Sequence, residues 1–214
     1  MNIGTLAAAA TAALALALPA QANTSVTLDF EGVGSFASVG DFYNAGTDGN
    51  GNSGTNFGVS FSDASLGLSN DALATYFSNA PTPGTVMFAT DSSAVMNVAK
   101  GFVNEISFYY SAASSALDVV TLYSGLNGTG NELGSISLSK NAQLGGCSDS
   151  PFCHWQRLSL TFSGTALSAT FGGNAGNVAF DNVAITAVPE PASALLMALG
   201  GAALLIGARR RAQH

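Results

Sequence analysis

The strongest constraint on the fold is a series of short runs in which apolar and polar residues alternate. Residues 158–162 read LSLTF, so every second side chain is apolar, and a β-strand places such side chains on one face of a sheet. Runs rich in β-branched and aromatic residues cover 26–30, 57–61, 85–89, 105–110, 117–123, 134–138, 155–162, 167–171 and 178–186. Turn-forming clusters separate them, including residues 48–52 (DGNGN) and 81–84 (PTPG). Since no run is typical of a crossover helix, the pattern predicts an all-β, jelly-roll-like β-sandwich.

An apolar segment precedes this region. Residues 6–18 carry no charge, and the run is shorter than the roughly 20 residues that a permanent membrane-spanning helix needs. Ala20 and Ala22, with Gln21 between them, form the A-x-A pattern that signal peptidase recognises. We therefore expect a signal peptide over residues 1–22, cleaved after Ala22, although its first five residues contain no Lys or Arg.

The C-terminal segment has three parts in a fixed order. Pro189, Glu190 and Pro191 come first, and each proline removes a helical hydrogen-bond donor. Residues 192–208 follow without a charge, and Arg209, Arg210 and Arg211 come last. Arginines beside an apolar span hold that end of the span on the cytoplasmic side. The sequence predicts a C-terminal hydrophobic helix that anchors the protein transiently in the inner membrane, with residues 23–187 outside.

This Pro-Glu-Pro motif, with the apolar helix and arginine cluster after it, resembles the PEP-CTERM sorting signal. The resemblance covers residues 188–214. It implies a substrate of exosortase, a membrane-embedded cysteine protease of exopolysaccharide-producing Gram-negative bacteria. The alternative is a plain membrane anchor in which residues 189–191 are an incidental linker.

Charge narrows the range of partners for the region between the two ends. Residues 23–187 contain three basic side chains, Lys100, Lys140 and Arg157, against twelve acidic ones, which gives a net charge of −9. Such a surface repels nucleic acid, whose binding requires a basic patch. It is compatible with divalent cations or with neutral sugars.

The two cysteines, Cys147 and Cys153, are separated by five residues. An even number of cysteines in an exported protein predicts a disulfide. The competing interpretation is a metal site with the adjacent His154, but this pattern lacks a fourth ligand at the spacing usual for zinc.

Two sets of oxygen-bearing side chains are candidates for calcium. Residues 48–54 (DGNGNSG) place oxygen ligands at alternate positions, although the bidentate Glu of an EF-hand is missing. The second set depends on residues 28–31 (LDFE), 54–61 and 180–183 (FDNV). These resemble sandwich modules common among PEP-CTERM proteins, and carbohydrate-binding jelly rolls in which the first and last strands pair. That pairing would bring Asp29 or Glu31 to Asp181; the alternative is that these carboxylates are solvated groups at a sheet edge.

Catalytic motifs are scarce. His154 is the only histidine of residues 23–187, and no serine lies in a G-x-S-x-G elbow. Trp155 begins an alternating run, which favours a core position over a sugar-stacking role. We expect a non-enzymatic protein of the cell surface or extracellular matrix that contacts extracellular polysaccharide. The alternatives are a carbohydrate-binding module with structural calcium and, third, a secreted hydrolase with paired carboxylates.

Overall fold

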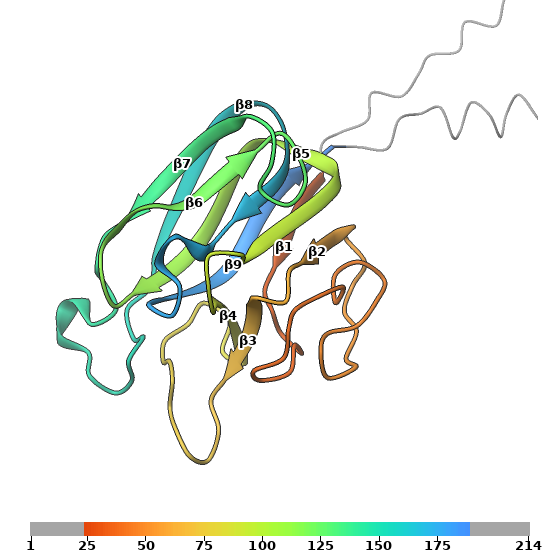
Figure 1. Cartoon of the computed structure of the whole chain (residues 1–214). Helices are drawn as coiled ribbons and strands as arrows, with labels where there is room; N and C mark the ends of the chain where they lie inside the picture. The colour runs from red at the N-terminus through yellow and green to blue at the C-terminus, as the bar shows by residue number, and fades with distance from the viewer. Residues whose placement is uncertain (1–23, 189–214) are drawn as a thin grey trace, which may run out of the picture. The chain divides into compact units, whose positions relative to one another are not determined.

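The computed structural model describes residues 24–188, which form nine β-strands and two single-turn 3₁₀ helices (Figure 1). The predicted signal peptide with Ala20 and Ala22, and the tail from Pro189 through Arg211, lie outside these residues. The strands are β1 (Thr24–Leu28), β2 (Val59–Phe61), β3 (Ser65–Ser69), β4 (Thr85–Ala89), β5 (Val95–Ala112), β6 (Ala116–Tyr123), β7 (Glu132–Leu138), β8 (Gln156–Thr170) and β9 (Val178–Ala187). The 3₁₀ helices are η1 (Leu144–Gly146) and η2 (Gly172–Asn174). Between residues 24 and 188, no helix combines the length and hydropathy of a membrane span.

Two long strands, β5 and β8, connect the layers of the sandwich. The first part of β5 pairs with β2 and with the end of β8, whereas its second part lies between β8 and β9. The register shifts between Asn97 and Phe102, where Gly101 has a φ of 83°. A Cβ atom on Gly101 would collide with the side chain of Thr165 on β8. Glycine therefore permits both the turn of the backbone and the close approach of the two strands.

The first and last strands pair, as the sequence predicts. β1 lies antiparallel to β9 along its whole length, from Thr24 opposite Ala187 to Leu28 opposite Val183. The other end of β9 pairs with β4, through Phe180 opposite Met87. The residues that follow β1 are consequently brought to the middle of β9. The jelly-roll connectivity itself remains a prediction.

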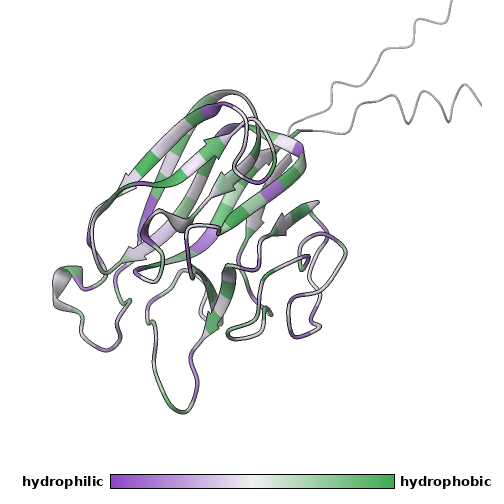
Figure 2. Ribbon diagram, viewed as in Figure 1, coloured by the Kyte–Doolittle hydropathy of each residue, from purple (hydrophilic) through white to green (hydrophobic). Residues whose placement is uncertain are grey.

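Alternation along the strands creates the main core. On β5, Ile106, Phe108 and Tyr110 are buried on the inner face, and Figure 2 shows apolar and polar residues alternating along the strands. Phe108, Phe171 and Phe180 pack edge to face, with ring centroids 5.1–6.3 Å apart. Edge-to-face contacts add to the hydrophobic stabilisation that burial of these rings provides.

A second, smaller cluster lies on the outer face of the β3–β4–β9 end of the sheet. Its buried members are Leu68, Phe77, Val86 and Ala179, and Trp155 packs against them. The Trp155 indole N–H donates to the Ser78 carbonyl, 2.9 Å away, and its ring meets Phe77 edge to face. The structure thus places Trp155 in a packing role. The loops before β4 and before β8 cover this part of the outer face.

Candidate functional site

The most buried carboxylate of the domain belongs to Asp181, on the outer face of β9. Its side chain is 0% exposed, and it receives the main-chain N–H groups of Thr82 (2.9 Å) and Asn182 (2.7 Å). The Thr82 hydroxyl lies 2.8 and 2.9 Å from its two oxygens. Burial raises the pKa of Asp181 to about 6, the bonds from Thr82 and Asn182 oppose this rise, and the negative charge of Glu31 adds to it.

Asp29 lies beside this group, immediately after β1. Its carbonyl oxygen is 3.3 Å from the Thr82 hydroxyl, so that hydroxyl faces both Asp29 and Asp181. The Asp29 carboxylate accepts the Tyr43 hydroxyl at 3.2 Å, and the Tyr43 oxygen accepts the Phe30 N–H at 2.7 Å. Burial and then the charge of Asp29 raise the pKa of Tyr43 well above its usual value. Tyr43 therefore stays neutral and fixes the chain where it leaves β1.

Glu31 points toward the loop that carries Thr82. Its Oε1 accepts the N–H groups of Gly84 (2.9 Å) and Thr85 (3.2 Å). The structure therefore gathers Asp29, Glu31 and Asp181 around residues 82–85. The three carboxylates do not form a tight triad: within residues 24–188, the one group of three with ligand atoms all within 4.8 Å of one another is Cys147, Asp149 and Cys153.

The Thr82 hydroxyl lies among several acceptor oxygens. A threonine hydroxyl has a single proton, yet this one faces three acceptor oxygens, two from Asp181 and one from Asp29. Calcium prefers such mixtures of carboxylate, carbonyl and hydroxyl oxygens. Asp29 and Glu31 also line a surface cavity of ≈ 270 Å³, whereas Asp181 is fully buried behind them. Here the term acidic cluster denotes Asp29, Glu31, Thr82 and Asp181.

Backbone conformation at the acidic cluster is unusual at two positions, one just after β1 and one within β9. Phe30, between Asp29 and Glu31, has a φ of 59°, and Asn182, directly after Asp181, has a φ of 48°. A bulky residue such as Phe rarely adopts this left-handed region, and such strain gathers at functional sites.

The 48–54 loop is organised differently from the calcium loop that its sequence suggests. The Asp48 side chain is 4% exposed and accepts hydrogen bonds from the N–H groups of Gly34 (2.7 Å), Asn50 (2.9 Å) and Asn52 (2.8 Å). The Asn52 side-chain amide donates a fourth, at 2.9 Å. Burial acts to raise the pKa of Asp48, but these donors together hold it below its usual value. Its oxygens are thus directed at protein N–H groups, and Asp48 anchors the loop.

Cys147 and Cys153 form the expected disulfide, with Cα atoms 6.0 Å apart. The bond removes both thiolates that the alternative metal site would need. His154 is half-buried next to it, and its main-chain N–H donates to the Ala142 carbonyl at 2.9 Å. Both cysteines and His154 therefore belong to the loop that leads into β8.

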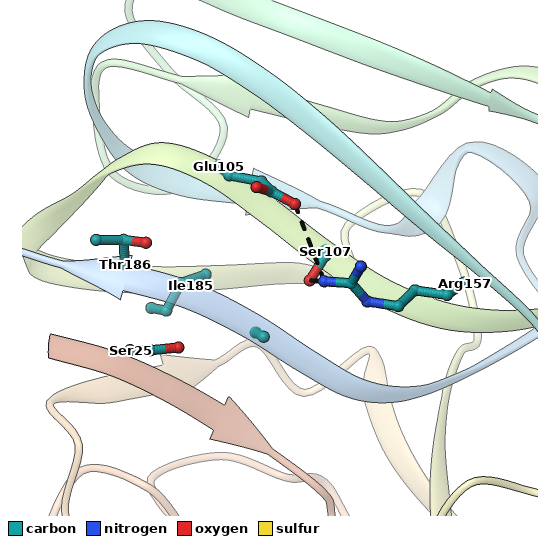
Figure 3. Close-up of a pocket in the computed structure, with 7 residues that line it drawn as sticks. Ser25, Glu105, Ser107, Arg157, Ile185 and Thr186 are labelled. Carbon is teal, nitrogen blue, oxygen red and sulfur yellow. Dashed lines mark hydrogen bonds and ion pairs between the residues drawn. The ribbon is translucent and has the colours of Figure 1, made fainter.

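A polar groove lies on the outer face of β1, β9, β5 and β8, with a volume of ≈ 130 Å³ (Figure 3). Arg157 of β8 extends over Ser107 of β5, and its Nη2 donates to the Ser107 hydroxyl at 2.9 Å. The same nitrogen is 4.0 Å from Glu105 Oε1. The sequence did not identify these residues as a site. The alternating pattern of β5 shows which side chains point away from the core, but not which residues of other strands lie beside them.

Several solved structures resemble the chain distantly. The K2 cleaved adhesin domain of Lys-gingipain has a TM-score of 0.45 at 14% identity, over 76% of this chain and 99% of that one. A family 29 carbohydrate-binding module from Piromyces equi has a TM-score of 0.41 at 10% identity, over 77% and 91%. The module CsCBM6-3 from Clostridium stercorarium, solved with cellobiose, has a TM-score of 0.35 at 16% identity, over 59% and 88%. Similarity this distant assigns no ligand to the chain.

The sequence comparisons concern the C-terminal tail. A search of curated protein sequences finds no match to the chain. The family model of the PEP-CTERM protein-sorting motif matches residues 187–211, which contain Pro189, Glu190, Pro191 and the three arginines. This motif implies export to the cell envelope or the extracellular space. The match confirms the resemblance drawn from the tail alone: the chain carries a PEP-CTERM protein-sorting motif at residues 187–211.

Proposed function

We propose that the protein is a non-enzymatic component of the cell surface or extracellular matrix, which signal peptidase and exosortase process at its two ends. The main support for this proposal is the sorting motif at residues 187–211, because such a motif targets a protein to the cell envelope. The disulfide adds support, since disulfides persist in oxidising compartments outside the cytoplasm. The tail anchors the precursor in the inner membrane until it is cut.

Intact-mass spectrometry of the protein recovered from the envelope and the medium of its host tests this proposal. The expected mass lacks residues 1–22 and also the apolar tail after Pro191. A mass that retains residues 192–214 identifies a plain membrane anchor, and a mass that retains residues 1–22 contradicts signal-peptide cleavage.

A second candidate function is a carbohydrate-binding sandwich stabilised by calcium. The specific observation in its favour is the acidic cluster, in which Thr82 joins the carbonyl of Asp29 to the buried carboxylate of Asp181. A bound calcium ion would supply the positive charge that the neutral donors around Asp181 lack. Asp181, Glu31 and the Asp29 carbonyl would hold it.

Calcium is expected to raise the thermal stability of the chelator-treated protein. At a concentration 100 times the Kd, binding to the folded state stabilises it by about 2.7 kcal/mol, which raises Tm by about 5–10 °C for a domain of this size. Differential scanning calorimetry with and without CaCl₂ measures the shift. Asp181→Asn should abolish the increase, whereas Asp149→Asn, which neutralises an exposed carboxylate beside the disulfide, should keep it. An unchanged Tm in the wild-type protein contradicts the calcium site.

A further inference from the structure

Five of the seven residues that line the polar groove are polar or charged, and the two apolar ones, Ala184 and Ile185, are aliphatic. Strand alternation places Glu105 and Ser107 of β5 opposite the buried Ile106 and Phe108. Ser25 of β1 and Thr186 of β9 are paired residues and add two hydroxyl groups to the same face. Protein partners usually bind through surfaces with an apolar, aromatic centre, which this groove lacks.

The charged pair in the groove is available to a ligand. Arg157 and Glu105 have side chains that are 56% and 41% exposed, and their closest approach of 4.0 Å makes a weak surface ion pair. In Figure 3 the Arg157 guanidinium reaches Ser107, and the Glu105 carboxylate faces the same guanidinium. Arg157 offers several N–H donors in a fixed plane, and Glu105 offers only acceptors. Together they can bind two neighbouring hydroxyl groups of a ligand: one hydroxyl accepts a hydrogen bond from Arg157, and the other donates one to Glu105.

We propose that the polar groove binds a neutral polysaccharide through Arg157 and Glu105, while the buried Ser107 hydroxyl holds the Arg157 guanidinium in position. An anionic polymer is disfavoured, because residues 23–187 have a net charge of −9 and Glu105 lies next to the groove's single cation. Hydroxyl-rich sugars suit a surface of paired donors and acceptors, where hydrogen bonds to charged groups are the stronger ones.

The same face continues from the groove toward the acidic cluster. Ser25 of β1 lines the groove. Thr27 lies two residues further along β1 on the same face, and it lines the ≈ 270 Å³ cavity together with Asp29 and Tyr43. Two residues of a strand span about 7 Å. The two depressions therefore lie in line along β1, which suits an extended polymer better than a single sugar unit.

This inference rests on the second candidate function, carbohydrate binding, and its test separates the two. Affinity electrophoresis of the protein recovered from its host measures retardation in gels that contain a soluble β-glucan, mannan or xylan, with polygalacturonate as the anionic comparison. We expect retardation by at least one neutral polymer. Arg157→Gln and Glu105→Gln should each weaken the affinity about tenfold or more, as the loss of a hydrogen bond to a charged group predicts.

Lys140→Gln is the matched control, since it removes a cation from an exposed residue outside the groove. It should bind like the wild-type protein, and circular dichroism should give similar Tm values for all variants. If Arg157→Gln and Glu105→Gln bind as tightly as wild type, the groove is the wrong site while carbohydrate binding stands. If no neutral polymer retards the wild-type protein, both the groove and the second candidate function are overturned. Retardation by polygalacturonate alone overturns the proposed ligand class.

Discussion

Deletion of Arg209–Arg211 is expected to convert the exported protein into an unprocessed precursor that accumulates in the membrane. Each arginine opposes entry into the bilayer by about 2.5–3.5 kcal/mol at its centre, so three together fix the depth of the apolar span before them. In the proposed topology, the deletion lets the apolar segment 192–208 slide through the bilayer, so that Pro189-Glu190-Pro191 would no longer be held at the periplasmic face of the inner membrane. Glu190→Ala should have the same outcome through the motif itself.

Immunoblots of membrane and medium fractions, with intact masses of both, measure this effect. Deletion of residues 212–214 (AQH) is the matched control, because it also shortens the chain by three residues but leaves the arginines in place. The control should be processed normally. Normal release of both the Arg209–Arg211 deletion and Glu190→Ala would falsify the assignment of the tail as a processed signal.

Asp48→Ala is expected to destabilise the folded domain by about 1–3 kcal/mol. The substitution removes the acceptor of the N–H groups of Gly34, Asn50 and Asn52, and leaving a partly buried donor such as that of Gly34 unsatisfied costs about 1–3 kcal/mol, whereas water can reach the N–H groups of the exposed Asn50 and Asn52. For a domain of this size the corresponding fall in Tm is about 2–12 °C. Urea denaturation followed by circular dichroism measures the change in the free energy of unfolding.

The effect of Asp48 should also depend on pH. Because its pKa is lower in the folded than in the unfolded protein, the carboxylate stabilises the fold above the unfolded pKa of about 4. That contribution is lost as pH falls through the folded pKa. The stability difference between wild type and Asp48→Asn should therefore be largest near pH 7 and shrink below about pH 4. Asp41→Asn alters an exposed carboxylate in the same loop, which accepts a hydrogen bond from the Asn44 side-chain amide, and it should change stability little. A loss of stability equal to that of Asp48→Asn would contradict the anchoring role of Asp48.

Local sequence patterns predicted most strands but not their lengths. The runs at 85–89 and 117–123 correspond closely to β4 and β6, because alternation and β-branched residues mark strands with one buried face. The runs at 155–162 and 167–171 are parts of one strand, β8, which continues through Gly164 with a φ of 89°. The partner β5 keeps this strand paired on both sides of Gly164, so the two runs form a single strand. β3 was missed, since residues 65–69 (SLGLS) lack β-branched residues.

The candidate sites were predicted less completely than the strands. Asp29, Glu31 and Asp181 were expected together from the pairing of the first and last strands, and β1 and β9 do pair. Thr82, which joins Asp29 to Asp181, had no signal beyond its place in a proline-rich turn, and it lies 99 residues from Asp181. Asp48 was interpreted as a candidate calcium ligand because the sequence shows its carboxylate. It does not show that main-chain N–H groups of the folded loop donate hydrogen bonds to that carboxylate.

The sequence by itself determined the C-terminal sorting motif, the all-β class and the disulfide, because each depends on the order of residues along a short stretch of chain. Only the tertiary structure decided that Arg157, Glu105 and Ser107 share a groove and that Thr82 completes the acidic cluster. Both arrangements depend on which strands become neighbours and in which register. A shift of one residue in that register would send every one of these strand side chains to the opposite face of the sheet.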